Sequence, residues 1–198
     1  MSRKKIVKST HLDFGCGNNP RNPFGSYDTI SVDINRYSNE IPHYVIKPGS
    51  PLPFQDNTID SISAFDVLEH LSREPSNNLF VFYMNELHRI LKPKGMALFI
   101  FPDVHNREVY SDPTHVNFIH KNTVDYFLSN SPNQNYAGIQ TNYILIKNKK
   151  IRIWNSYFGS FSEINEAKNL RRKLSLIKRE FYRLIFPTHR VWILKKNV

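Results

Sequence analysis

The sequence predicts an α/β fold built on a doubly wound, mostly parallel sheet with an antiparallel edge. Short apolar segments rich in β-branched and aromatic residues recur at 11–14, 29–34, 59–65 and 96–101, as expected of core strands. A glycine turn closes the first segment, and a helical segment precedes the fourth. Strands that alternate with helices and finish with antiparallel pieces are typical of a parallel sheet with a modified edge.

One helix is expected between Ser76 and Leu91. Its apolar residues recur at steps of three and four, the period of a helix face: Leu79, Phe82, Tyr83, Leu87, Ile90 and Leu91. The segment 92–95, KPKG, then ends the helix with a proline and a glycine. The near-continuous apolar run 96–101 is typical of a strand buried on both faces.

The C-terminal part predicts a hairpin, a basic helix and a last strand. NYILI (142–146) and KIRIW (150–154) flank residues 147–149 as two hairpin strands, and VWIL (191–194) is the last strand. Between them, 166–186 predicts an amphipathic helix with one apolar stripe and basic residues on its other faces. The stripe consists of Leu170, Leu174, Ile177, Phe181, Leu184 and Ile185.

Composition favours one globular domain over 1–198. The chain is long enough for a full hydrophobic core, and its 40% hydrophobic content argues against disorder. Cys16 is the single cysteine, which excludes an internal disulfide framework and a multi-cysteine zinc site and favours the cytoplasm. No apolar run approaches the ~20 residues of a membrane span, and no apolar segment follows the basic start. We therefore expect neither export nor membrane insertion.

The net charge of +10 is concentrated near the C-terminus, where 168–198 holds ten Lys and Arg residues against Glu180 alone. The basic helix there could cover the core and expose its charge to solvent. It could also attract nucleic-acid phosphates, an anionic membrane surface or a phosphorylated small molecule. The sequence leaves these readings open.

The segment 12–20, LDFGCGNNP, places two of the chain's seven glycines one residue apart after a strand. Dinucleotide-binding turns require a third glycine, and Pro20 stands at that position, which disfavours NAD or FAD. Such a turn suits a cofactor without phosphates, for which the backbone need only come close. Asp33 lies 18 residues after Gly15 at the end of the next strand, where an acid can accept hydrogen bonds from ribose hydroxyls. Ribose without pyrophosphate points to S-adenosyl-L-methionine (SAM).

Five motifs in order resemble the class I SAM-dependent methyltransferases, closest to a small bacterial-type group with LPF, LEH, KPxG and DPTHV signatures. They are LDFGCGNNP, VDIN, PLPFQDNTIDSISAFDVLEHL, ELHRILKPKGMALFIFPD and SDPTHV. The resemblance covers 10–120, with a weaker echo in the final strand. It implies a Rossmann-like fold, a methyltransferase activity and SAM as cofactor. Residues 10–120 would form the SAM-binding core, and 121–198 the acceptor side.

The resemblance assigns one part of the cofactor to the glycine turn and the strand beside it. Asp13 would hold the methionyl amino group, and Gly15 and Gly17 would make room for the methionyl and ribose parts. Asp33 would bind the ribose hydroxyls, with Ile34 against the adenine face.

The resemblance places four more residues around the cofactor. Leu52 and Phe54 correspond to the loop that walls the adenine, and Phe65 and Asp66 would lie beneath the sulfonium. Relatives often carry an acid shortly before LPF, whereas this chain has KPGSP at 47–51. The contact to the adenine amino group would then come from the backbone or be absent.

Methyl transfer from a sulfonium needs a base only if the acceptor must lose a proton. The candidates follow the strand 96–101 at the edge of the sheet where ligands bind: Asp103, His105, Asp112 and His115. His115 is the predicted base, since an imidazole with a pKa near ~6.5 accepts a proton at neutral pH, and Asp112 is its predicted catalytic partner. In the structural alternative, Asp112 caps a turn and His115 bridges backbone groups. A metal held by these four residues is conceivable, but no metal is expected.

Glu69 and His70 fall near the start of a helix, where they are surface groups or catalytic residues.

From the glycine turn and the five motifs, the predicted function is methyl transfer from SAM to an oxygen or nitrogen of a small-molecule or saccharide-like acceptor. The alternatives are an RNA or DNA methyltransferase that uses the basic helix, and a catalytically silent SAM-fold partner subunit.

Overall fold

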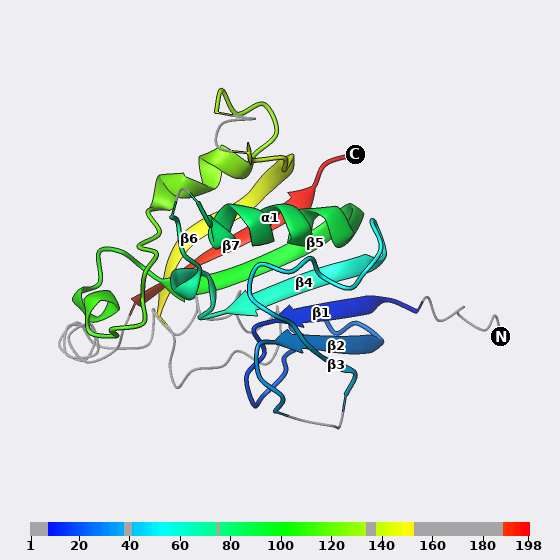
Figure 1. The fold of residues 1–198 in the computed structure, drawn as a ribbon. Helices are drawn as coiled ribbons and strands as arrows, with labels where there is room; N and C mark the ends of the chain where they lie inside the picture. Colours follow the sequence, from blue (N-terminus) through cyan, green and yellow to red (C-terminus); the bar gives the residue numbers. More distant parts are fainter. Residues whose placement is uncertain (1–7, 38–40, 75, 134–137, 153–187) are drawn as a thin grey trace, which may run out of the picture.

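A computed structural model describes residues 8–37, 41–74, 76–133, 138–152 and 188–198. In these residues, seven strands form one sheet in the order β3-β2-β1-β4-β5-β7-β6 (Figure 1). The strands are β1 (Thr10–Phe14), β2 (Asp28–Asp33), β3 (His43–Val45), β4 (Ile59–Phe65), β5 (Leu91–Pro102), β6 (Tyr143–Arg152) and β7 (Thr188–Lys196).

The predicted sheet architecture is confirmed. Strands β3, β2, β1, β4 and β5 are parallel to one another, whereas β7 runs antiparallel to both β5 and β6. The carboxyl ends of the parallel strands therefore share one edge, where α/β sheets bind ligands. Both predicted chemical regions, the glycine turn and the segment after β5, leave the sheet at that edge.

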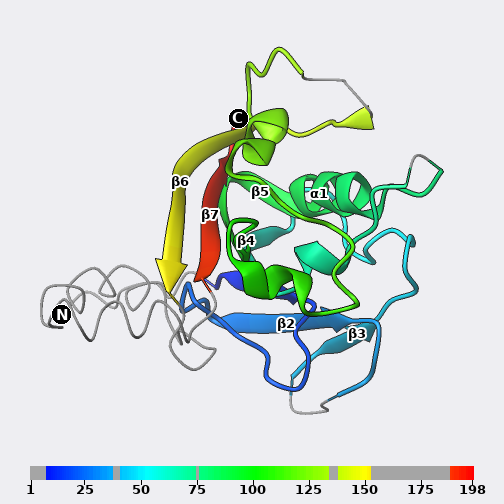
Figure 2. The same cartoon turned by 90° about the vertical axis from the view of Figure 1, so that its left-hand side faces the viewer.

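The predicted helix is α1 (Leu79–Ile90), which lies across one face of the sheet (Figures 1 and 2). It begins where the Asn78 side chain accepts a hydrogen bond of 3.0 Å from the Val81 amide, which satisfies one of the free amides of the first turn. It ends just before KPKG, as predicted. Short 3₁₀ helices are η1 (Leu68–His70), η2 (Arg107–Tyr110) and η3 (Lys121–Phe127).

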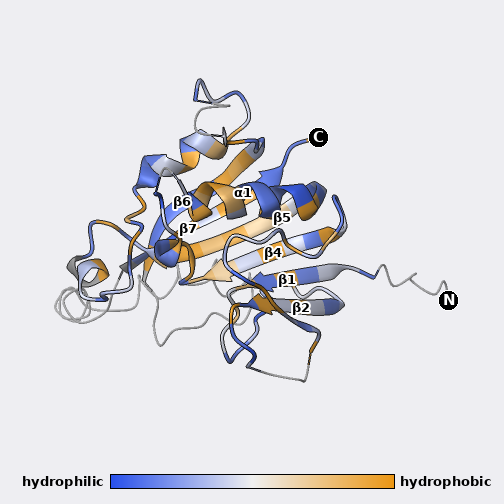
Figure 3. Cartoon of the chain, viewed as in Figure 1, coloured by the Kyte–Doolittle hydropathy of each residue, from blue (hydrophilic) through white to orange (hydrophobic). Residues whose placement is uncertain are grey.

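The core lies on both faces of the central strands. In β5, Ala97, Phe99 and Phe101 belong to the large cluster that includes α1, while Leu98 and Ile100 belong to a second cluster. This alternation follows the two-residue period of a strand. Figure 3 shows the hydrophobic residues concentrated on β4 and β5, in the middle of the sheet.

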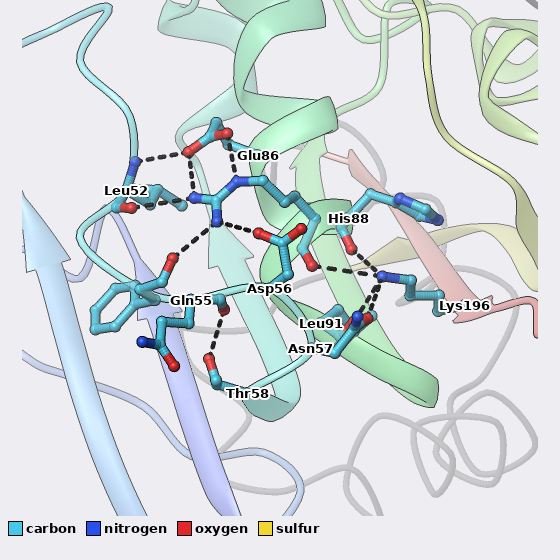
Figure 4. Close-up of polar contacts among 11 residues, drawn as sticks. Leu52, Gln55, Asp56, Asn57, Thr58, Glu86, His88, Leu91 and Lys196 are labelled. Atoms are coloured by element: carbon cyan, nitrogen blue, oxygen red, sulfur yellow. Dashed lines mark hydrogen bonds and ion pairs between the residues drawn. The ribbon is translucent and has the colours of Figure 1, made fainter.

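The last strand fixes the end of α1. The Lys196 ammonium on β7 lies 2.8 Å from each of the backbone oxygens of His88 and Leu91 and from the Asn57 side-chain oxygen (Figure 4). A cation at a helix C-terminus satisfies free carbonyls and opposes the helix dipole. Lys196, one of the basic residues of 168–198, therefore has a structural role. The predicted helix 166–186 lies outside the described residues.

The predicted hairpin at 142–154 is wrong. Residues 143–152 form one continuous strand, β6, which pairs along its length with β7. Residues 147–149 offer no glycine or aspartate for a tight turn, and lysines are common on an edge strand such as this one. Within the described residues, none of the helices combines the length and apolar content that a membrane span requires.

Candidate functional site

The glycine turn after β1 is packed on one side and open on the other. Gly15 has a φ of +69°, and its amide donates to the Val32 carbonyl at 2.7 Å. A Cβ at Gly15 would lie 2.1 Å from a methyl carbon of Val67, so no side chain fits there. Gly17 has a φ of +55°, but nothing lies within 4 Å of the position of its Cβ. The turn therefore leaves open space above Gly17.

Asp13 is fixed by a buried chain of hydrogen bonds. Its oxygens accept from the Ser63 hydroxyl at 2.7 Å and from the Arg21 amide at 2.8 Å. Because the Ser63 hydroxyl donates its proton to Asp13, the Ser63 oxygen accepts a hydrogen bond of 2.9 Å from His11 Nε2. The other ring nitrogen, His11 Nδ1, then accepts from the Ser61 hydroxyl at 2.9 Å. Burial raises the pKa of Asp13 to about 6 and lowers the pKa of His11 to about 4. The carboxyl group is thus held in one orientation before any ligand arrives.

Asp33 lies across the same turn, at the end of β2. Its two oxygens accept from the Gly17 amide at 3.0 Å and from the Asn35 amide at 3.1 Å. The neighbouring Ile34 is 57% exposed, so its side chain is free to contact a ligand. Cys16 is buried, and burial raises the pKa of its thiol to about 11, which excludes a reactive thiolate at neutral pH.

The LPF loop is attached to α1 through Arg89. The guanidinium donates to the carbonyls of Leu52 at 3.1 Å and Phe54 at 2.8 Å (Figure 4). Glu86 holds this guanidinium at 2.7 Å and also accepts from the Leu52 amide at 2.7 Å. These contacts explain why the LPF and ELHR motifs occur together: one supplies the loop and the other clamps it.

The two predicted adenine-side residues differ in their surroundings. The Leu52 side chain is buried in the core, whereas the Phe54 ring is only partly buried. Tyr44 on β3 packs edge-on against Phe54 with ring centroids 5.0 Å apart, and it is 40% exposed. Sequence reasoning missed Tyr44 because β3 itself was not predicted.

Phe65 and Asp66 lie where β4 ends, as predicted. The Arg21 guanidinium carbon lies 4.5 Å from the centre of the Phe65 ring. Asp66 has a φ of +54°, uncommon for a residue with a side chain. Its carboxylate lies 3.1 Å from His189 Nε2 on β7. The end of β4 is thereby joined to the antiparallel edge.

The LEH and DPTHV motifs dock on each other. The amides of Val116 and Asn117 both donate to the Glu69 carbonyl, at 2.9 and 2.8 Å. The Asn117 side-chain amide donates to the Leu68 carbonyl at 2.9 Å. The loop after β5 is therefore held over η1, which brings the side chains of the two motifs together.

His115 points its Nε2 atom toward two carboxylates. Its Nδ1 atom lies 2.8 Å from the Val109 carbonyl, which only accepts, so Nδ1 carries the proton of the neutral ring. Nε2 lies 3.7 Å from Asp112 Oδ2 and 3.9 Å from Glu69 Oε1. Asp112 Oδ1 also caps the turn by accepting from the amide of Thr114 at 2.8 Å. The DPTH segment therefore makes the turn contacts expected of a structural role, and His115 Nε2 remains without a hydrogen bond to any described residue.

Glu69 is 1% exposed, and neither of its carboxylate oxygens has a hydrogen-bond partner. Burial, with a further contribution from the Asp66 charge, raises its pKa to about 8. The reading of Glu69 as a surface group is therefore wrong, whereas His70 is exposed. A signal for this burial was available in the apolar sequence DVLEHL that surrounds the glutamate.

The other two candidates after β5 are directed elsewhere. Asp103 is buried and pairs with Arg190 at 2.7 Å and with Lys150 at 3.6 Å. Burial opposes its ionisation, but the His105 amide and Arg190 together hold its pKa below the ordinary value. The His105 ring packs against His120 with centroids 5.7 Å apart. The residues considered together in the sequence, Asp103, His105, Asp112 and His115, do not form one cluster.

Comparison with known proteins gives a family match over part of the chain. Residues 12–99 match the family described as "Methyltransferase domain". An uncharacterized protein of Methanocaldococcus jannaschii is 30% identical over 100 residues, which are 45% of this chain and 39% of that protein. The chain thus spans well under half the length of that curated relative.

Solved structures agree in fold. A SAM-dependent methyltransferase from Archaeoglobus fulgidus is 16% identical with a TM-score of 0.54, covering 95% of this chain and 86% of that one. Phosphoethanolamine N-methyltransferase 2 from Haemonchus contortus, in complex with SAM, is 13% identical with a TM-score of 0.53, covering 98% and 50%. These likenesses show a shared fold, and the family match at 12–99 covers less than half of the chain.

Proposed function

We propose that this protein transfers a methyl group from SAM to an oxygen or nitrogen of a small-molecule or saccharide-like acceptor. The observation that carries the proposal is the turn between β1 and β2, where Asp33 holds the Gly17 amide at 3.0 Å. The space at the Cβ position of Gly17 is open. An acid beside an open glycine turn suits a ribose without a pyrophosphate, and the matched domain, 12–99, includes all of these residues.

The remaining cofactor contacts follow from the same edge of the sheet. Asp13 would receive the methionyl amino group, because its carboxyl group is already oriented by Ser63 and Arg21. Ile34 and Phe54 offer apolar surface for the adenine. Leu52 supports the adenine loop from the core, and Phe65 and Asp66 close the site at the end of β4.

His115 is the proposed base for an acceptor that must lose a proton. Its Nδ1 hydrogen bond to Val109 leaves the lone pair on Nε2 free to accept a proton. Asp112, 3.7 Å from Nε2, would stabilise the resulting imidazolium. The methyl donor is already activated, so the remaining task of the protein is to orient the acceptor and exclude water.

A labelled-methyl experiment tests the function. Purified protein is incubated with isotope-labelled SAM and, separately, with the small-molecule and RNA fractions of a lysate, and the products are identified by mass spectrometry. We expect the label in a small molecule. Label confined to RNA would replace this proposal by the nucleic-acid alternative. SAM binding without a labelled product in any fraction would favour the silent partner subunit. The cytoplasmic location stays a prediction.

A further inference from the structure

Glu69, His70 and His115 bring one carboxylate and two imidazoles together from separate parts of the chain. One ligand atom from each lies within 4.8 Å of the others. In the described part of the chain this is the one group of three or more His, Cys, Asp or Glu residues with such spacing. The docking of the DPTHV loop on η1 creates it.

The buried carboxylate in this group lacks a partner. Glu69 is 1% exposed, and both of its oxygens are without a hydrogen bond. Buried polar groups are nearly always paired, because an unpaired one costs free energy. The nearest cluster atom with a recorded distance is His115 Nε2, at 3.9 Å from Oε1, which is too far for a hydrogen bond.

The histidines are oriented as metal ligands usually are. Metal-binding imidazoles commonly donate their second nitrogen to a backbone carbonyl or a carboxylate, which fixes the ring. His115 Nδ1 lies 2.8 Å from the Val109 carbonyl, and His70 Nδ1 lies 3.2 Å from the Thr114 carbonyl. The two rings meet edge-on with centroids 4.9 Å apart.

We propose that Glu69, His70 and His115 bind a divalent first-row transition-metal ion, of which Zn²⁺ is the most convenient probe. Two imidazoles and one carboxylate suit such ions better than Mg²⁺ or Ca²⁺, which prefer oxygen ligands. Ligand bonds of about 2.1 Å place tetrahedral donor atoms roughly 3.4 Å apart, so these side chains need only a small inward movement. Asp112 Oδ2, 3.7 Å from His115 Nε2 and partly exposed, is a fourth donor at the rim.

A bound ion would also affect the proposed methyl transfer. The ion and the acceptor's proton compete for the same lone pair on His115 Nε2. With the ion in place, an acceptor hydroxyl that joined it would lose its proton to water more readily, because a metal lowers the pKa of a bound O–H group. This consequence rests on the proposed function, whereas metal binding itself does not.

The test is a calorimetric titration of EDTA-stripped protein with ZnCl₂. We expect one saturable site in the wild-type chain and at least tenfold weaker binding in Glu69→Gln, His70→Ala and His115→Ala. His105→Ala is the matched control, since it removes a histidine of the same loop outside the cluster, and its affinity should equal that of the wild type.

SAM titration of the same samples keeps the two proposals apart, and thermal unfolding shows that each variant is folded. Absence of a saturable Zn²⁺ site in the folded wild type would overturn the metal site, whether or not SAM binds. Undiminished Zn²⁺ affinity in both Glu69→Gln and His70→Ala would also overturn it.

Discussion

Asp13 and Glu69 are both buried carboxylates near the ligand edge of the sheet, yet their surroundings differ. Asp13 accepts from Ser63 and Arg21 and stands at the end of a hydrogen-bonded chain through His11. Glu69 is equally buried, but its oxygens have no hydrogen-bond partner. Burial raises the pKa of Asp13 to about 6 and that of Glu69 to about 8.

The comparison teaches which side of the site is complete without a ligand. On the cofactor side, Ser63 and the Arg21 amide already satisfy and orient the Asp13 carboxyl group, which we propose as the partner of the methionyl amino group. Around the proposed base, Glu69 Oε1 and His115 Nε2 lie 3.9 Å apart with no hydrogen bond between them. That side needs a further group, which we propose to be a metal ion.

The largest expected effect comes from the two glycines of the cofactor turn. Gly15→Ala should lower the free energy of unfolding by about 2 to 5 kcal/mol, because the new methyl group meets Val67 and the positive φ is strained. Gly17→Ala should cost only about 1 kcal/mol of stability, since its Cβ meets nothing, but it should weaken SAM binding. Urea unfolding and SAM titration measure the two effects. Equal losses of stability in the two variants would contradict the assignment of Gly15 to the packed side of the turn and Gly17 to its open side.

In metal-free protein, His115→Ala should lower kcat about 100-fold once an acceptor is known, since a general base contributes about that much. The SAM affinity should stay within about twofold, because the base acts on the acceptor. His105→Ala is the control within the same loop. A kcat equal to that of the wild type would show that His115 is not the base and only holds the loop through its hydrogen bond to the Val109 carbonyl.

A smaller effect concerns pH on the cofactor side. If the Asp13 carboxylate binds the ammonium of SAM as proposed, SAM affinity should be greatest near pH ~7 and fall by up to tenfold per unit below the pKa of about 6. His11, with a pKa of about 4, stays neutral in this range.

The sign for stability is opposite to that for binding. The folded pKa of Asp13 lies above its unfolded value of 3.8, so the stability that it contributes is complete below pH 3.8 and is lost as pH rises through 6.

Asp13→Asn tests the binding prediction and should bind SAM weakly with a flat pH profile between 5 and 7. A steep profile that survives in Asp13→Asn would assign the titration to another group.

The sequence predicted the sheet and the glycine turn after its first strand because both depend on local patterns. Gly15 and Gly17 follow directly after an apolar strand, and β4 and β5 are apolar runs whose period is visible in the chain. The hairpin predicted at 142–154 was wrong because a distant strand decides the conformation of this segment. β7 begins more than 35 residues after β6 ends, and it pairs with β6 from Tyr143 to Arg152.

The candidate acceptor side was only partly predictable. His115 and Asp112 were identified from their residue types after a buried strand. The burial of Glu69 arises when the amides of Val116 and Asn117, nearly fifty residues away in sequence, dock on its carbonyl. A contact of that kind has no local pattern. The apolar residues of DVLEHL and the joint occurrence of LEH and DPTHV were the available hints.

Calorimetric titration with SAM, S-adenosylhomocysteine and NAD tests the central claim most directly, in the wild type and in Asp33→Ala. We expect both adenosyl compounds to bind the wild type and NAD not to bind. Asp33→Ala should weaken SAM binding by roughly 1 to 3 kcal/mol, because the ribose hydroxyls and the Gly17 amide lose their acceptor. Binding of NAD without SAM, or an unchanged SAM affinity in Asp33→Ala, would contradict the assignment of this turn as the cofactor site.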